Sequence, residues 1–193
     1  SEHRPVGLTV VTPPWNFPVA IPAGSTLAAL AAGSPVVIKP AAQAARSGAV
    51  MVEALWEAGV PREVLQYVQL EERQLGTQLI SHPAVERVIL TGGYETAELF
   101  RSFRPDLPLL AETSGKNAII VTPSADLDLA AKDVAYSAFG HAGQKCSAAS
   151  LVILVGTVAE SERFRRQLVD AVGSYKVGAP WDGSSRIGPL IGP

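Results

Sequence analysis

The sequence predicts an α/β fold in which helices cover both faces of a parallel sheet. Two observations favour this fold class. Short β-branched runs alternate along the chain with Ala-rich segments of helical character. The runs are apolar throughout instead of alternating with polar residues, which is typical of parallel strands that are buried on both faces.

The first half of the chain contains four expected strands with three helical segments between them. The strands are the runs 6–11, 35–40, 65–70 and 87–92. The helical segments cover 26–33, 47–59 and 75–82. Glycine and then proline end the first two helical patterns, because glycine adopts the left-handed C-cap conformation and proline cannot continue a helix.

The second half continues the alternation and contains the only cysteine of the chain. Strands are expected at 107–112, 117–122 and 150–156, and helices at 126–140 and 160–175. The last helical segment has its charges on one side, which indicates a surface helix. Cys146 stands before the 150–156 strand, in the stretch GHAGQKCSAAS.

Composition argues against several function classes. The 193 residues include 16 basic and 18 acidic side chains spread along the chain, so no basic surface for nucleic acid is indicated. One cysteine and three scattered histidines give no metal-ligand spacing. The most apolar region, 19–38, is interrupted by glycine and proline, which disfavours a membrane span. We therefore expect a soluble, cytoplasmic protein without a metal or a signal peptide.

Three polar residues stand beside strand ends in glycine- or proline-rich surroundings, where open α/β sheets place their ligands. They are Asn16 in TPPWNFP, Glu112 in LLAETSGKN, and Cys146. Each also has a simpler interpretation: Asn16 as a turn residue, Glu112 as a solvated carboxylate, and Cys146 as a small hydrophobe.

The same three residues form a consistent catalytic set. A cysteine near a helix terminus and beside Lys145 is a candidate nucleophile, because positive surroundings favour the thiolate. A carboxylate such as Glu112 can act as general base for a hydrolytic step. The side-chain amide of Asn16 can stabilise the oxyanion that forms when a thiolate adds to a carbonyl.

The segments PWNFP, VIKP, TGG, AETSGK and GQKCSA, in this order, resemble the successive signatures of the NAD(P)-dependent aldehyde dehydrogenase superfamily. The intervals between the segments are similar too, and the likeness extends through all 193 residues. Family members are much longer on both sides, so the chain resembles a central excerpt. The resemblance implies a Rossmann-like sheet in a partial cofactor-binding domain at 1–113 and the beginning of a second α/β catalytic domain at 114–193.

The resemblance also implies roles for individual residues. Cys146 corresponds to the nucleophile, Glu112 to the general base for thioester hydrolysis, and Asn16 to an oxyanion donor that acts with the Cys146 backbone N–H. The implied cofactor is NAD, with NADP as the alternative. Its implied contacts are Lys39 at the adenosine ribose, Trp15 and Pro14 along the nicotinamide channel, and Gly76, Gly92 and Gly93 beside adenine and pyrophosphate.

Two departures from the family pattern bear on the cofactor. The family often has glutamate three residues after the ribose-binding lysine, and here Ala42 stands at that position. Loss of this acid removes an acceptor for the ribose hydroxyls and removes repulsion toward a 2′-phosphate, which leaves the choice between NAD and NADP open. The usual turn G-S-T-x-x-G is GGYETA at 92–97, which loses a hydroxyl and adds a tyrosine.

A narrower resemblance concerns the substrate. AETSGKNAIIV and GQKCSA are similar to the branch that oxidises glutamate γ-semialdehyde, the open form of pyrroline-5-carboxylate, in proline catabolism. This branch includes the dehydrogenase part of bifunctional proline-utilisation enzymes. The resemblance implies a small-molecule aldehyde as substrate, held by Ser147 and Phe17. It also implies that a full-length parent is a homo-oligomer.

Two other functions stay open at this point. The first is a catalytically inactive dinucleotide-binding or structural module, which Ala42 and the altered 92–97 turn favour. The second is a cofactor-free cysteine hydrolase or acyltransferase. His141 lies five residues before Cys146, a poor facing geometry on a helix, so a surface or capping role is expected for it. The isolated chain is expected to be inactive, because family members complete the site with a later segment.

Overall fold

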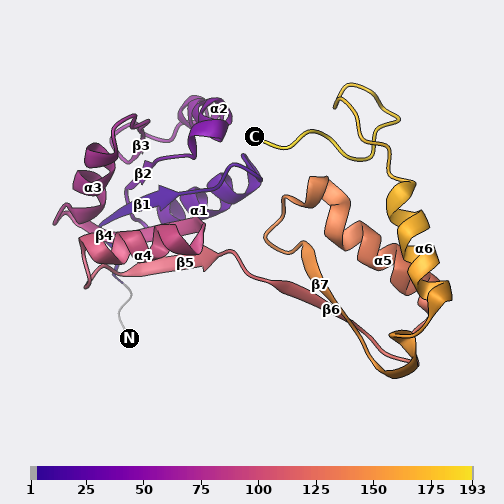
Figure 1. Cartoon of the computed structure of the whole chain (residues 1–193). Helices are drawn as coiled ribbons and strands as arrows, with labels where there is room; N and C mark the ends of the chain where they lie inside the picture. The colour runs from indigo at the N-terminus through magenta and orange to yellow at the C-terminus, as the bar shows by residue number, and fades with distance from the viewer. Residues whose placement is uncertain (1–3, 193) are drawn as a thin grey trace. The chain divides into compact units, whose positions relative to one another are not determined.

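The computed structural model describes residues 4–192. The chain divides between Ser114 and Gly115 into two compact units, and each is described by itself. Figure 1 shows the first unit from indigo to pink and the second from orange to yellow. Across residues 4–192, none of the helices is long and apolar enough to cross a membrane.

The first unit contains a five-stranded parallel sheet in the order β3-β2-β1-β4-β5. Its strands are β1 (Leu8–Thr12), β2 (Val36–Ile38), β3 (Leu65–Tyr67), β4 (Val85–Gly92) and β5 (Leu109–Thr113). The chain moves outward from β1 to β3 and then crosses back to β4 on the other side of β1. The strand order therefore reverses between β1 and β4, and open α/β sheets bind ligands beyond the carboxyl ends of such a pair.

Four α-helices connect these strands. They are α1 (Ala20–Ala31), α2 (Ala45–Glu57), α3 (Arg73–Ser81) and α4 (Tyr94–Phe103), with a short 3-10 turn η1 (Ala42–Ala44) before α2. The sequence patterns predicted all of them except η1 and α4. Residues 92–97 were interpreted as a turn, but the turn ends at Gly93 and the following residues form a helix that buries Ala97.

The helices cover the sheet on both faces, and alternate strand residues point to each face. Val10, Val88 and Leu90 are buried on the face covered by α3 and α4. Val11 and Ile38 are buried on the face covered by α1 and α2. Burying each such side chain contributes roughly 1.5–3 kcal/mol. The predicted fold class, a parallel sheet between two helical layers, is confirmed.

The second unit is built on a two-stranded parallel sheet. Its strands are β6 (Asn117–Val121) and β7 (Ala149–Leu154), its helices are α5 (Leu127–Phe139) and α6 (Glu162–Gly173), and η2 (Gly140–Gly143) and η3 (Gly156–Val158) are short 3-10 turns. Both helices begin at a side-chain cap. Asp126 accepts hydrogen bonds from backbone N–H groups of α5, and Ser161 accepts one from α6. Such caps each contribute about 1 kcal/mol.

The helices of the second unit lie against one face of its sheet. Val121, Val134 and Phe164 are buried between β6, α5 and α6. The other face carries apolar side chains that are exposed to solvent: Ile120 is 62% exposed, Leu151 46% and Ile153 41%. Within residues 115–192 no helix covers this second face.

Candidate active site

The segment after β1 contains four of the predicted site residues. Strand β1 ends at Thr12, and the loop that leads to α1 contains Pro14, Trp15, Asn16 and Phe17, each half-buried. This loop stands at the carboxyl end of the central strand, beside the reversal of strand order. The sequence places it there because Pro13 and Pro14 cannot extend a central strand.

Lys39 lies beside this loop. It follows β2, and its backbone N–H donates to the Val11 carbonyl oxygen at 2.9 Å. Two residues later, the Ala41 N–H donates to the Pro13 carbonyl oxygen at 3.2 Å. These two bonds hold the exits of β2 and β1 together, with the half-buried Lys39 next to the 13–19 loop.

Three glycines were predicted to leave room for a dinucleotide. Gly76 lies in the first turn of α3, and a Cβ atom placed there would meet nothing within 4 Å. Gly92 is the last residue of β4, and Gly93 is the N-cap of α4. A Cβ on Gly93 would come within 3.2 Å of the Glu95 carboxylate, so this acidic side chain lies against the N-terminal turn of α4.

Tyr94, the residue that departs from the family turn, is held by its own helix. Its hydroxyl donates to Glu98 Oε1 at 2.9 Å, one helical turn further along α4. The hydrogen bond to Glu98 raises the pKa of Tyr94 above its ordinary value. The phenol therefore stays protonated near neutral pH and remains a hydrogen-bond donor to Glu98.

Glu112 lies near the carboxyl end of β5 and is exposed. It pairs in register with Thr91 of β4, and the next pair is Thr113 with Gly92. The Ser114 N–H then donates to the Gly92 carbonyl oxygen at 3.2 Å. Glu112 is thus fixed on the same edge of the sheet as the 13–19 loop, Lys39 and Gly92, two strands away from β1.

Cys146 lies in the second unit, in a turn directly before β7. The Ala148 N–H donates to the Lys145 carbonyl oxygen at 3.1 Å, which closes a turn with Cys146 and Ser147 at its centre. Both central residues are exposed, and the thiol is free. The turn continues into a strand rather than a helix. The helix that was expected before Cys146 ends at Phe139, with η2 between it and the cysteine turn, and no helix begins at Cys146.

The backbone before Cys146 adopts an unusual conformation. His141, Ala142 and Gly143 have φ angles of 57°, 55° and 69°. The left-handed region suits glycine and costs energy for the two residues that carry a Cβ. Gly143 is required here for a second reason, because a Cβ would lie only 3.0 Å from the Ala138 carbonyl oxygen.

Two further contacts fix this loop. The Gln144 side-chain oxygen accepts a hydrogen bond from the Ile191 N–H at 2.9 Å. The Lys145 ammonium lies over the Tyr136 ring, 5.9 Å from its centroid, a cation–π contact. Sequence interpretation considered Lys145 as an activator of the thiol, whereas the structure directs this ammonium toward an aromatic ring on α5.

Asn117 was not predicted as a functional residue, and the structure places it against the cysteine turn. Its side-chain nitrogen donates to the Cys146 carbonyl oxygen at 2.5 Å and to the Ala148 carbonyl oxygen at 3.1 Å. The sequence carries a weak signal for it, since asparagine is depleted in strands and here stands at the first position of an otherwise apolar one.

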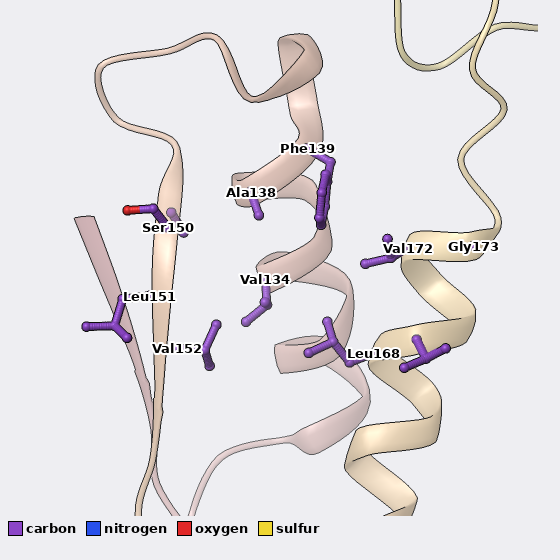
Figure 2. Close-up of a pocket in the computed structure, with 11 residues that line it drawn as sticks. Val134, Ala138, Phe139, Ser150, Leu151, Val152, Leu168, Val172 and Gly173 are labelled. Atoms are coloured by element: carbon purple, nitrogen blue, oxygen red, sulfur yellow. The ribbon is translucent and has the colours of Figure 1, made fainter. Parts of the chain in front are cut away.

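A pocket of about 660 Å³ lies between β7, α5 and α6. Figure 2 shows Val134 on α5 pointing toward Val152 on β7, while Leu151 points to the other side of the strand. The lining is apolar apart from the Ser150 hydroxyl. Substrate sites usually combine an apolar wall with several converging polar groups. This pocket is therefore a poor match to a catalytic site.

The structure brings the predicted residues together in two sets. The first set lies along one edge of the five-stranded sheet and includes Asn16, Lys39 and Glu112. The second set is Cys146 and Ser147 in the turn before β7. That Asn16 and Glu112 converge with Cys146 stays a prediction. Among residues 4–192, no group of three or more His, Cys, Asp or Glu side chains is arranged to hold a metal ion.

Comparison with known proteins assigns the family. The model of the aldehyde dehydrogenase family matches residues 1–193. The chain belongs to the aldehyde dehydrogenase family. A 1-pyrroline-5-carboxylate dehydrogenase of Anoxybacillus flavithermus is 39% identical over 197 residues, which cover 98% of this chain and 38% of that protein. The chain thus spans well under half the length of this curated relative.

Solved structures of the aldehyde dehydrogenase family agree with the fold. Proline Utilization A from Corynebacterium freiburgense is 52% identical with a TM-score of 0.93, over 100% of this chain and 20% of that chain. An NADP-dependent glyceraldehyde-3-phosphate dehydrogenase from Bacillus halodurans, complexed with NADP, is 35% identical with a TM-score of 0.92. That match covers 98% of this chain and 39% of the other.

Proposed function

We propose that this chain carries the cofactor-binding and nucleophile-bearing parts of an NAD(P)-dependent aldehyde dehydrogenase. Residues 1–113 would bind the dinucleotide, and residues 114–193 would begin the catalytic domain. The observation that supports this most is the single thiol, Cys146, exposed at the centre of a hydrogen-bonded turn in a chain that matches the family over its whole length.

In the proposed first step the Cys146 thiolate forms a carbon–sulfur bond with the aldehyde carbon. The carbonyl electron pair moves to oxygen, and the Asn16 amide and the Cys146 backbone N–H donate hydrogen bonds to that oxyanion. Donors of this kind are each worth about 100- to 1,000-fold in rate. Bound NAD(P) would supply the hydride acceptor that converts the adduct to a thioester.

Glu112 serves the second half of the reaction. Its exposed carboxylate takes a proton from water, the resulting hydroxide attacks the thioester carbon, and the carbon–sulfur bond breaks to release the carboxylate product and the thiolate. The position of Glu112 on a strand, with its backbone fixed by β4, suits a base that must aim one water molecule.

The residues along the sheet edge fit a dinucleotide. Pro14 and Trp15 follow β1 and Gly92 ends β4, the two strands at which the strand order reverses. Lys39 follows the neighbouring strand β2, and Gly76 lies in α3 after β3. The half-buried Lys39 would donate to ribose hydroxyls, and the open space at Gly76 would admit adenine. Trp15 and Pro14 would line the nicotinamide end, while Gly92 and Gly93 would allow the pyrophosphate to approach the backbone.

The choice between NAD and NADP depends on two positions, one that lacks an acidic side chain and one that carries one. Ala42 offers no carboxylate to bind ribose hydroxyls or to repel a 2′-phosphate. Glu95, against the first turn of α4, instead opposes an anion at that helix N-terminus. We propose NAD as the cofactor, with NADP tolerated, and the relative from Bacillus halodurans that is complexed with NADP supports that tolerance.

The proposed substrate is glutamate γ-semialdehyde, oxidised to glutamate in proline catabolism. The relatives named 1-pyrroline-5-carboxylate dehydrogenase and Proline Utilization A support it. Ser147, exposed beside Cys146, would hold the substrate carboxylate, and Phe17 would pack on the substrate chain. We further propose that the full-length parent is a homo-oligomer. We also propose that it is cytoplasmic, since a reducing compartment keeps the thiol active.

The decisive experiment replaces Cys146 with Ala in a protein of full family length that carries residues 1–193. Reduction of NAD with glutamate γ-semialdehyde should fall to background, while binding of NADH, followed by fluorescence titration, is unchanged. Turnover that survives in the variant refutes the nucleophile. A wild-type protein that binds NADH but oxidises no aldehyde would instead support an inactive dinucleotide-binding module.

A second experiment tests whether the two sets converge. Asn16→Cys adds a second thiol to a chain that has only Cys146. A short bifunctional thiol cross-linker should join the two positions within one chain, as peptide mass spectrometry can show. Ser124→Cys, in the loop after the end of β6 that lies away from Cys146, serves as the control. Equal cross-linking of both variants would contradict a shared site.

A further inference from the structure

The side-chain amide of Asn117 makes two hydrogen bonds to the cysteine turn. One nitrogen donates to the carbonyl oxygens of Cys146 and Ala148, at 2.5 Å and 3.1 Å. The turn itself is closed by the Ala148 N–H and the Lys145 carbonyl. Together these bonds tie the backbone on either side of Ser147 to the first residue of β6.

The turn needs stabilising contacts from outside it, because the segment before it adopts an unfavourable backbone conformation. His141 and Ala142 adopt left-handed φ angles, which residues with a Cβ rarely hold without support. The pairing of β6 with β7 also shifts register between Asn117 and Ala118, at the end nearest the turn. The ladder is irregular at this end, and the two side-chain hydrogen bonds of Asn117 supplement the pairing of Asn117 with Ala149.

We propose that Asn117 is a positioning residue for Cys146: its amide holds the turn in the single orientation from which the sulfur can attack an aldehyde. The proposal rests on the proposed function of Cys146 as nucleophile. Asparagine suits the task because one NH2 group offers two N–H donors to two carbonyl oxygens. Aspartate has the same shape but, when ionised, only acceptors, so it would repel both carbonyls.

The test compares Asn117→Ala and Asn117→Asp with a control, Thr122→Val. Thr122 directly follows the end of β6 that lies away from Cys146, and its side-chain hydroxyl shares a hydrogen bond with the Ser124 hydroxyl at 3.0 Å. In a protein of full family length that carries residues 1–193, kcat for aldehyde oxidation should fall about 10- to 100-fold in both Asn117 variants. KM for NAD should stay within about threefold, because the first unit is unchanged.

A second readout separates orientation from reactivity. Alkylation of the thiol by iodoacetamide needs an exposed thiolate but no particular orientation of the turn. At high pH its rate in Asn117→Ala should therefore stay within about threefold of wild type while kcat falls. A merely structural role would lower kcat only in proportion to the folded fraction, which circular dichroism measures on the same samples, and a kcat that follows the folded fraction overturns the proposal.

Three other outcomes are informative. If the wild type oxidises aldehyde and both Asn117 variants match Thr122→Val, the positioning role is wrong while the proposed function stands. If the wild type oxidises no aldehyde, the proposed function fails and the positioning role fails with it. If the variants do not fold, the wild-type chain is tested instead, by the rate at which the Asn117 carboxamide protons exchange with solvent. Exchange slower than in the urea-unfolded chain supports the proposal, and an equal rate overturns it.

Discussion

The two units of the chain bury their sheets differently. The five-stranded sheet of the first unit has helices on both faces, and its central residues Val10 and Val11 are buried on opposite sides of one strand. The two-stranded sheet of the second unit has helices on one face, while Ile120 and Ile153 on the other face are exposed.

The difference teaches where stability comes from in each unit. A parallel sheet is stable when both faces are covered, since its strands are apolar on both sides. The first unit meets this condition with its own residues. In the second unit only one face of the sheet is covered, and each strand has a single hydrogen-bonded neighbour. Its buried apolar side chains lie between the sheet and the helices α5 and α6. The cysteine turn therefore belongs to the unit that covers less of its sheet with its own residues.

The largest effect is expected from separating the units. Residues 4–114 expressed alone should unfold in one cooperative thermal transition, measured by far-UV circular dichroism. Residues 115–192 alone should unfold gradually and bind the dye ANS, because two strands with a bare apolar face make a marginal fold. A sharp transition without dye binding for 115–192 would show that the comparison between the units is wrong.

A matched pair of isoleucine truncations tests burial directly. Ile38→Ala, at a fully buried position of β2, should lower the free energy of unfolding by about 2–5 kcal/mol. Ile120→Ala, at a position of β6 that is 62% exposed, should change it by no more than about 0.5 kcal/mol. Urea unfolding gives both values. Similar losses in the two variants would mean that the outer face of β6 is covered in solution.

Two glycine replacements should act in opposite directions. Gly143→Ala forces a Cβ into a left-handed position 3.0 Å from a carbonyl oxygen, so it should destabilise the second unit by about 1–2 kcal/mol. Gly24→Ala, inside α1 with open space around it, should stabilise the first unit by about 0.5–1 kcal/mol. Thermal midpoints report both signs, and a stabilising Gly143→Ala would refute the left-handed loop.

The smallest effect concerns acidification of the segment after α6. Hydrogen bonds from Ser184 and from Lys176 lower the pKa of Asp182 from 3.8 to about 2. Because the folded pKa lies below the unfolded one, this carboxylate stabilises the segment above about pH 4, and its contribution is lost as the pH falls through about 2. Amide NMR signals of Ser184 should move in that window. Asp182→Asn should remove the movement, and an unchanged titration would contradict the assignment.

Much of the fold could be predicted from the sequence because the strands are short and strongly apolar. All seven predicted strands are present, with boundaries that differ by up to three residues. The helix α4 was missed because the glycines before Tyr94 suggested a turn. Its helical character depends on Ala97, Phe100 and Phe103 packing on the sheet, a tertiary contact that local patterns do not carry.

The candidate site could be predicted in part. Asn16 and Glu112 were singled out because each stands beside a strand end, and parallel strands bring such positions to one edge. Lys39 was assigned only through the family resemblance. Asn117 was missed because its role depends on a contact with residues 29 and 31 positions away. The direction of the Lys145 ammonium, toward the Tyr136 ring, likewise depends on how α5 packs and has no signature in local spacing.

The central place of β1 has a consequence for biosynthesis. Its Thr12 contacts Ile89 of β4, 77 positions further along the chain, so the ribosome must make all of α1 to α3 before β1 gains its second neighbour. During that interval the nascent sheet keeps an unpaired backbone edge that can associate with other chains. We therefore expect aggregation of the nascent chain to be favoured most in this window, before β4 leaves the exit tunnel.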